Sequence, residues 1–346
     1  MDNSSQNIRQ ASLQDITNFL VSNGEKAFRA KQIWQWIWQR GVTDFEEMTN
    51  LSRTTRELLR QNWYFDCLEP VHIQTATDGT TKTAWKLYDG EIIESVLIPG
   101  NQKFTVCVSS QVGCKLGCKF CATGTLGFKR NLTYGEIFNQ VTAAKMAAEA
   151  QGFPLSNIVF MGMGEPMLNY DNVLAAIERI TAEDGLAMSP YRITVSTAGI
   201  PDKIRQLADD GVRFNLAVSL HAAKESVRTS LMPINKAYSL KEVADSLKYF
   251  VEKTGTRPTF EYLLLKDIND SLEDAKALAF YCRQFPIKIN LIEYNNVEGS
   301  GFQHSPDKKR DEFVKYLENC NMVVNIRRSK GKDIDAACGQ LAAKEV

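Results

Sequence analysis

Strand-like and helix-like stretches alternate along the chain beyond residue 100, and this order limits the folds that are open to it. The candidate strands are Phe104–Ser109, Asn157–Met161, Arg192–Ser196, Arg213–Leu220, Thr259–Leu265 and Lys288–Tyr294. The candidate helices between them are Tyr134–Ala150, Tyr170–Ala182, Pro201–Asp210, Leu240–Thr254 and Leu272–Gln284. Such alternation predicts an α/β fold with a parallel sheet and right-handed crossovers. Six strands are too few to close an eight-stranded barrel, so we predict a partial (β/α)6 barrel.

The segments on either side of this barrel have a different character. Residues 12–62 carry apolar side chains at helical spacing and predict a small helical domain. Residues 71–99 are strand-like and contain the turn dipeptide Asp89-Gly90, which predicts a β-hairpin linker. After the barrel, a helix at Pro306–Asn319 and a strand at Met322–Arg327 predict a further α/β piece. We therefore expect four segments, at residues 1–65, 66–100, 101–300 and 301–346.

Charge and composition weigh against several classes of protein. The chain has 41 basic and 41 acidic residues, which argues against nonspecific coating of nucleic acid, because such binding depends on phosphate neutralisation. Residues 308–332 nevertheless hold eight basic and three acidic residues, which leaves RNA contact open there. No stretch approaches the roughly 18 apolar residues of a membrane span, and no apolar leader is visible. We expect a cytoplasmic protein without a membrane contact, and a monomer, because no coiled-coil heptad is legible.

The eight cysteines are unevenly placed, with four of them between residues 107 and 121. In a protein that is not secreted, such clustering indicates metal binding or catalysis. Cys114, Cys118 and Cys121 have the spacing C-x3-C-x2-C just after the first candidate strand. Three thiolates can bind three irons of a four-iron cluster and leave the fourth iron open. The alternative is a zinc knuckle completed by Cys107, because a structural zinc site is closed by four ligands.

Polar and flexible residues stand at the ends of several candidate strands, where barrel folds place their active sites. The second strand ends in Gly162-Met163-Gly164-Glu165-Pro166, in which glycine lets the backbone approach a ligand and Glu165 can accept from an ammonium group. Ser196 ends the third strand, Ser219, Leu220 and His221 end the fourth, and Asn295 follows the sixth. Each of them alone is more typical of a turn or of a satisfied core group. Their joint position is what indicates a ligand site.

These motifs resemble the RlmN/Cfr family of radical S-adenosylmethionine (SAM) RNA methyltransferases over nearly the whole chain. The matching segments are Phe28–Ile33, Ser109–Cys114, Gly162–Pro166, Ser219–Ala222 and Asp333–Leu341. The resemblance implies a [4Fe-4S] cluster on the three cysteines and a radical SAM barrel around it. It implies SAM contacts at Gly164, Glu165, Ser196, Ser219, Leu220, His221 and Asn295. It also implies that the helical N-terminal domain is an accessory domain that binds RNA.

The activity implied by the resemblance is methylation of C2 of an adenine in 23S ribosomal RNA, and of an adenine beside the anticodon of some tRNAs. This carbon is electron-poor and cannot attack the methyl group of SAM, so radical chemistry is needed. One SAM would be cleaved to a 5′-deoxyadenosyl radical with electrons from flavodoxin or ferredoxin, and a second would donate the methyl group, so that two are consumed per turnover. The alternatives are C8 methylation, as in the Cfr branch, and more remotely a non-enzymatic metal-bearing RNA-binding protein.

A cysteine carries the methyl group in this family, in a ping-pong mechanism with an S-methylcysteine intermediate. The resemblance places this role at Cys338, the resolving thiol that forms a disulfide with it at Cys107, and the base at Glu94. From the residues alone, Cys107 is equally well a buried strand cysteine and Glu94 is one carboxylate among many. The pair Asn295-Asn296 departs slightly from the family pattern, in which a proline often follows the first asparagine.

Overall fold

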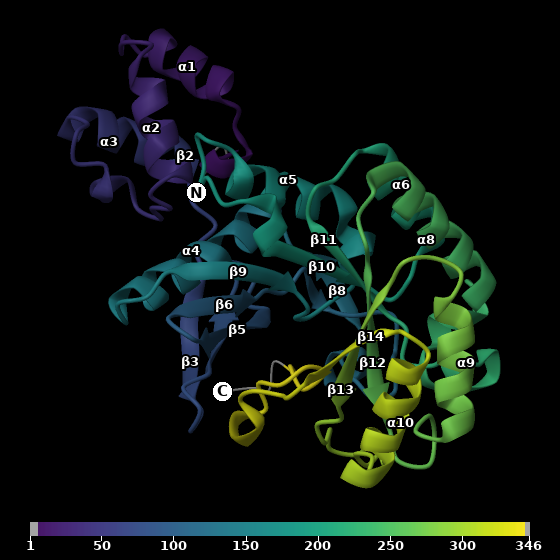
Figure 1. The fold of residues 1–346 in the computed structure, drawn as a ribbon. Coiled ribbons are helices and arrows are strands. Elements are labelled where there is room, and N and C mark those ends of the chain that lie inside the picture. Colours follow the sequence, from purple (N-terminus) through teal and green to yellow (C-terminus); the bar gives the residue numbers. More distant parts are fainter. Residues whose placement is uncertain (1–5, 343–346) are drawn as a thin grey trace.

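A computed structural model describes residues 6–342, and one large curved sheet forms its centre (Figure 1). Within this range the sheet has ten strands, in the order β14-β13-β12-β11-β10-β9-β6-β5-β4-β3. The parallel strands are β6 (Lys103–Cys107), β9 (Leu155–Phe160), β10 (Ile193–Thr197), β11 (Asn215–Ser219), β12 (Thr259–Leu264), β13 (Lys288–Glu293) and β14 (Val323–Arg327). The partial barrel is therefore confirmed, and the C-terminal strand β14 extends it by a seventh parallel strand at one edge.

Helices cover the outer side of the curved sheet (Figure 1). They are α4 (Tyr134–Ala150), α5 (Tyr170–Thr181), α6 (Pro201–Asp209), α7 (Glu225–Leu231), α8 (Leu240–Thr254), α9 (Leu272–Cys282) and α10 (Asp307–Asn319). Capping boxes begin α4, α8 and α9, at Thr133, Ser239 and Ser271. In each box two backbone N–H groups that would otherwise lack a partner are satisfied, which fixes where the helix begins. The seven-residue α7 was not predicted from the sequence.

The predicted β-hairpin is part of the same sheet. Strands β3 (Glu69–Thr75), β4 (Thr81–Lys86) and β5 (Ile92–Gly100) continue the sheet in antiparallel order beyond β6. Residues that face each other across two strands share one side of a sheet, as do residues two apart along a strand. Lys82 pairs with Val96, and Val96 pairs with Cys107. Lys82, Glu94 and Cys107 therefore all point to the same side of the sheet.

The N-terminal domain is helical, as predicted, and lies at one end of the barrel (Figure 1). It contains α1 (Leu13–Ser22), α2 (Arg29–Trp38) and α3 (Arg53–Asn62), with a 3-10 turn at Phe45–Glu47 and the short parallel strands β1 (Gln6–Asn7) and β2 (Trp63–Tyr64). Trp38 joins the domain to the barrel, because its ring lies 5.0 Å from that of Phe138 and 5.9 Å from that of Tyr134. The buried Arg9 guanidinium lies over the rings of Trp38 and Phe138 in the same junction.

A second, two-stranded sheet encloses the cysteine motif. Its strands are β7 (Gln111–Gly113) and β8 (Phe128–Asn131), and a 3-10 turn at Ala122–Thr125 lies between them. Further 3-10 turns lie at Ile8–Gln10, Pro166–Asn169, Pro190–Arg192, Pro233–Lys236 and Lys332–Ile334. Within residues 6–342, none of the helices combines the length and the apolar character that a bilayer crossing needs.

Candidate active site

A cavity of about 920 Å³, including its open mouth, lies at the carboxyl ends of the barrel strands. This is where barrel folds place their ligands, and the volume is that of a small-molecule site. Of the predicted site residues it is lined by Cys114, Cys118, Cys121, Gly164, Glu165, Ser196, Ser219, His221 and Cys338. Leu220 and Asn295 do not line it. Most of the site residues predicted from the ends of the strands therefore line one cavity.

The three clustered cysteines lie on the loop between β7 and β8. The loop is fixed by backbone hydrogen bonds from Cys114 N to Gly127 O (2.7 Å) and from Lys119 N to Leu231 O (3.0 Å). Burial raises the pKa of Cys114 to about 11 and also raises the pKa of Cys118, to which the neighbouring thiols add. Without a metal these thiols are therefore held protonated, and a bound metal would replace the protons.

The donor set fits an iron–sulfur cluster better than a single ion. Among the described residues, no group of three or more His, Cys, Asp and Glu side chains is placed to hold a metal ion. A zinc ion needs four ligands that meet within about 2.3 Å of one point, whereas the thiolates of a four-iron cluster bind different irons. Three thiols that line one cavity are suited to a four-iron cluster, and the cavity has room beside them for SAM.

Glu165 is held rigidly in the cavity wall by backbone amides. Its Oε1 accepts from Met167 N at 3.1 Å and its Oε2 from Ala198 N at 2.7 Å. Burial raises the pKa of this carboxyl, and these hydrogen bonds oppose the shift. A buried carboxylate with fixed oxygens is suited to accept hydrogen bonds from an ammonium group, because such charge-assisted bonds are the strong ones.

Gly164 allows this arrangement because no other residue fits at its position. Its φ is +99°, and a Cβ atom added there would lie 2.5 Å from the Cβ of Gln111. The Gln111 side chain in turn accepts a hydrogen bond from Glu165 N at 2.9 Å. The glycine therefore lets Gln111 approach the turn after β9 and hold Glu165 in place.

His221 is a neutral, buried part of the same wall. Its Nδ1 accepts from Leu263 N at 3.1 Å, which places the ring hydrogen on Nε2. Burial lowers the pKa of His221 to about 3, and the nearby Arg228 charge acts in the same direction. The ring also contacts Phe120 of the cysteine loop edge-on, with centroids 4.7 Å apart. This histidine can donate a hydrogen bond but is poorly suited to act as a base.

The other polar candidates differ in what they offer to a ligand. The hydroxyls of Ser196 and Ser219 lie 3.5 Å apart across two strands. Asn295 donates to Ser329 Oγ at 2.9 Å, while its buried Oδ1 has no hydrogen-bond partner among residues 6–342. A buried oxygen without a partner is an unfilled position for a donor. Leu220 has a structural part, because its carbonyl accepts from Arg228 Nε and its side chain is fully buried.

A second cavity, of about 670 Å³, lies beside the first and contains Cys107. Cys338 is exposed and borders both cavities. Burial raises the pKa of Cys107 to about 12 and raises that of Cys338, whose shift the Arg327 charge opposes. Both cysteines are free thiols. The structure thus brings together two cysteines that are 231 positions apart in the sequence.

Glu94 lies close by but borders neither cavity. Its carboxylate forms an ion pair with Lys82 Nζ at 3.2 Å, and both side chains are almost completely buried. Its Oε2 also accepts from Ala342 N, in the C-terminal segment, at 2.9 Å. Lys82 was missed in the sequence analysis, where it was one residue of the strand-like stretch 71–99.

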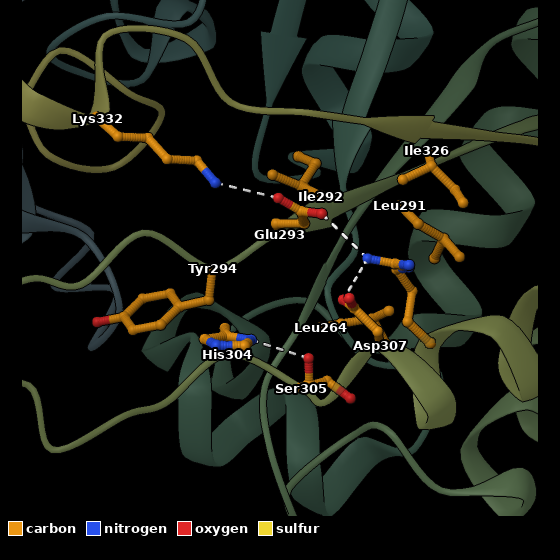
Figure 2. Close-up of a pocket in the computed structure, with 11 residues that line it drawn as sticks. Leu264, Leu291, Ile292, Glu293, Tyr294, His304, Ser305, Asp307, Ile326 and Lys332 are labelled. Atoms are coloured by element: carbon orange, nitrogen blue, oxygen red, sulfur yellow. Dashed lines mark hydrogen bonds and ion pairs between the residues drawn. The ribbon is translucent and has the colours of Figure 1, made fainter.

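The loop before Cys338 is fixed on two sides. On one side, Lys332 reaches Glu293 at 3.1 Å beside a cavity of about 540 Å³ (Figure 2). Glu293 also binds Arg310 at 3.2 Å. On the other side, Thr77 N donates to Asp333 Oδ2 at 2.9 Å. Glu293 and Asp307 balance the charges of Arg310 and Lys332 around this third cavity, so its charges are matched within the protein, and we assign it a structural role.

Arg327, from the basic stretch at residues 308–332, lies beside the two cysteines. It lines the cavity of Cys107 and Cys338, and its Nη1 lies 3.4 Å from Glu261 Oε2. Glu261 itself is buried in the wall of the first cavity. Arg327 therefore borders the site, while 40% of its side chain stays exposed.

Comparisons with known proteins agree with this geometry. Residues 6–64 match the family described as the ribosomal RNA large subunit methyltransferase N-terminal domain, and residues 108–279 match the radical SAM superfamily. A Flavobacterium johnsoniae protein named "Probable dual-specificity RNA methyltransferase RlmN" is 48% identical, covering 98% of this chain and 97% of that protein. A Cytophaga hutchinsonii protein of the same name is 49% identical, covering 98% and 93%. The crystal structure of a radical SAM methyltransferase from Sphaerobacter thermophilus superimposes with a TM-score of 0.94 at 38% identity, covering 98% of this chain and 100% of that one.

Proposed function

Since this chain belongs to the RlmN family of radical SAM RNA methyltransferases, we propose that it methylates C2 of an adenine in 23S ribosomal RNA and of an adenine beside the anticodon of some tRNAs. The observation that carries the proposal is the position of Cys338, which borders both the cavity of the three clustered cysteines and the cavity of Cys107. A thiol in this position can receive a methyl group on one side and be released by a second thiol on the other.

The clustered cysteines would hold a [4Fe-4S] cluster, and the first cavity would hold SAM beside it. When bound, the cluster and SAM supply the one-electron chemistry, which is reductive cleavage of SAM to a carbon radical and reoxidation of the RNA adduct. Glu165 would accept from the SAM ammonium group, and the serine hydroxyls, His221 Nε2 and Asn295 Oδ1 are available for its other polar groups. We further propose that a small electron-transfer protein such as flavodoxin or ferredoxin supplies the electrons, that two SAM are used per turnover, and that the enzyme acts as a monomer.

Three side chains of this protein would handle the methyl group. The thiolate of Cys338 takes the methyl group from SAM, forming an S–C bond as the bond from carbon to the sulfonium breaks. Once that methyl carbon has lost one hydrogen atom to the carbon radical and has bonded to the ring carbon, and the adduct has given up one electron, Glu94 takes the ring proton from the adduct. The thiolate of Cys107 then attacks the Cys338 sulfur, so that an S–S bond forms while the S–C bond breaks, and the released carbon takes up a proton. The disulfide is two electrons more oxidised than the two thiols, and an external dithiol reductant must return these electrons before the next turnover.

The target adenine must leave its stack to reach Cys338, because the thiol lies in the wall of two cavities. We propose that the N-terminal domain, residues 1–65, binds the surrounding RNA. Its packing on α4 through Trp38 fixes it to the barrel, so RNA held there would have a defined position relative to the cavity mouth.

The test is an anaerobic reaction of the reconstituted protein with SAM, reductant and a 23S RNA fragment, with nucleosides identified by mass spectrometry. We expect 2-methyladenosine, and 8-methyladenosine would contradict the proposed position. The Cys338→Ala variant should keep the cluster absorption and lose all product. Cys67→Ala is the matched control, because Cys67 is a free thiol that lines neither cavity. Full activity of Cys338→Ala would refute the role of this thiol.

A further inference from the structure

The ion pair between Lys82 and Glu94 is unusual in how deeply it is buried. The two side chains are 8% and 5% exposed, and they meet at 3.2 Å. Lysine is almost never so deeply buried unless it is paired, because removing an ammonium group from water costs several kcal/mol. A plain structural position in a β-strand would be filled at lower cost by an apolar side chain. The reason for a buried charge at Lys82 should therefore lie in what it does for its partner, Glu94.

Both members of the pair also bind the segment that carries Cys338. Lys82 Nζ donates to the carbonyl of Asp335 at 3.4 Å, three residues before the cysteine. Ala342 N donates to Glu94 Oε2 at 2.9 Å, four residues after it. The ion pair is thus in contact with the chain on both sides of Cys338. Any displacement of the pair would move the thiol and the carboxylate relative to each other.

We propose that Lys82 is a positioning residue that holds the Glu94 carboxylate in place through the ion pair and couples the place of Glu94 to that of Cys338. The inference rests on the proposed function, in which Glu94 is the base. In this step the proton of the ring carbon passes to the Glu94 carboxylate, which becomes a neutral carboxyl group, while Lys82 stays charged. Without the Lys82 ammonium group, Glu94 Oε1 loses the partner that fixes its position.

The proposal predicts a defect in one step of the reaction only. Methylation of Cys338 by SAM does not use Glu94, whereas release of the RNA adduct does. In the Lys82→Met variant, loading of Cys338 should stay within about twofold of the parent protein. The adduct should accumulate, and its release should slow by about 10- to 100-fold, part of the 10²–10⁴-fold that a general base contributes. Lys82→Arg keeps the charge and should restore most of the release rate.

The experiment uses the full-length reconstituted protein and follows the two steps separately. Peptide mass spectrometry measures the methyl group on Cys338, and denaturing gels measure the protein–RNA adduct and its decay. Lys86→Met is the matched control, because Lys86 lies on the same strand but is 51% exposed. Its ion pair with Glu69 is also longer, at 4.0 Å. This control should load and release as the parent protein does.

The possible outcomes separate the inference from the function on which it rests. Adduct that accumulates in Lys82→Met and is released again in Lys82→Arg supports the positioning role. Release at the parental rate in Lys82→Met overturns it. Loss of cluster, loading and release together, without rescue by arginine, also overturns it, because a merely structural lysine would behave in this way. If the parent protein itself forms neither adduct nor methylated adenosine, the proposed function fails first.

Discussion

Replacing Gly164 by alanine tests whether the turn after β9 sets the position of Glu165. At this position φ is +99°, and the new Cβ would lie 2.5 Å from Gln111 Cβ and 2.9 Å from Gln111 N. Backbone atoms cannot withdraw as the end of a flexible side chain can. Alanine must therefore displace Gln111 or the turn itself, and the side chain of Gln111 is the acceptor for Glu165 N.

The cost divides into two parts that a matched variant can separate. A non-glycine residue at positive φ costs about 1–3 kcal/mol. Overpacking against Gln111 adds about 1–3 kcal/mol. Gly152→Ala carries the first cost alone, because its φ is +82° and no heavy atom lies within 4 Å of the added Cβ. The free energy of unfolding should thus fall by about 1–3 kcal/mol in Gly152→Ala and by about 2–6 kcal/mol in Gly164→Ala, which urea titrations can measure.

The functional consequence should be weaker SAM binding in Gly164→Ala. If displacement of Gln111 costs one hydrogen bond between Glu165 and SAM, the loss is about 1.5–3 kcal/mol. That corresponds to about 10- to 150-fold in Kd, measured by anaerobic calorimetry on the reconstituted protein. Gly152→Ala should bind SAM as the parent protein does. Equal affinity of the two alanine variants would refute the reasoning that Gly164 positions the carboxylate through Gln111.

Two further predictions concern stability. Burial lowers the pKa of His221 from 6.5 to about 3, so between these values the unfolded chain binds a proton that the folded chain excludes. The free energy of unfolding should therefore fall as the pH drops below 6.5, by up to about 1.4 kcal/mol per pH unit. Urea titrations at several pH values should show a smaller fall for His221→Gln than for the parent protein. The same dependence on pH in both proteins would contradict this prediction. Trp38→Ala removes the packing of Trp38 on Phe138 and should cost about 3–5 kcal/mol. It should also make the N-terminal domain sensitive to limited proteolysis, and an unchanged unfolding midpoint would contradict this.

Much of the fold could be predicted because local pattern and global structure agree. Helices α4 and α8 begin and end at the residues expected from periodicity, since capping boxes fix their first residues and Gly255 ends α8. The edges of the sheet could not be predicted. Pairing of Val96 with Cys107 and of Leu291 with Ile326 depends on contacts between distant segments, which no local signal specifies.

The candidate site was predictable in so far as it depends on strand ends. Leu220 shows the limit of this reasoning, because side chains alternate at the end of a strand and its own points into the core rather than into the cavity. Lys82 could have been found from the hairpin. Once the turn at Asp89-Gly90 sets the pairing of Ala84 with Glu94, Lys82 becomes the diagonal neighbour of Glu94 on the same face of the sheet.

The position of Cys338 is where the separate parts of the chain meet. The residues after it bond directly to the cysteine loop, through Ala122 N to Gly339 O at 2.7 Å and Thr123 Oγ1 to Leu341 O at 2.6 Å. Before it, the backbone of Asp335 is held by Lys82. Both flanks of Cys338 are fixed, and the residue borders both cavities. The thiol therefore needs no domain movement to pass from one cavity to the other. We infer that a displacement on the scale of the side chain and its short loop is enough for Cys338 to meet SAM first and Cys107 later.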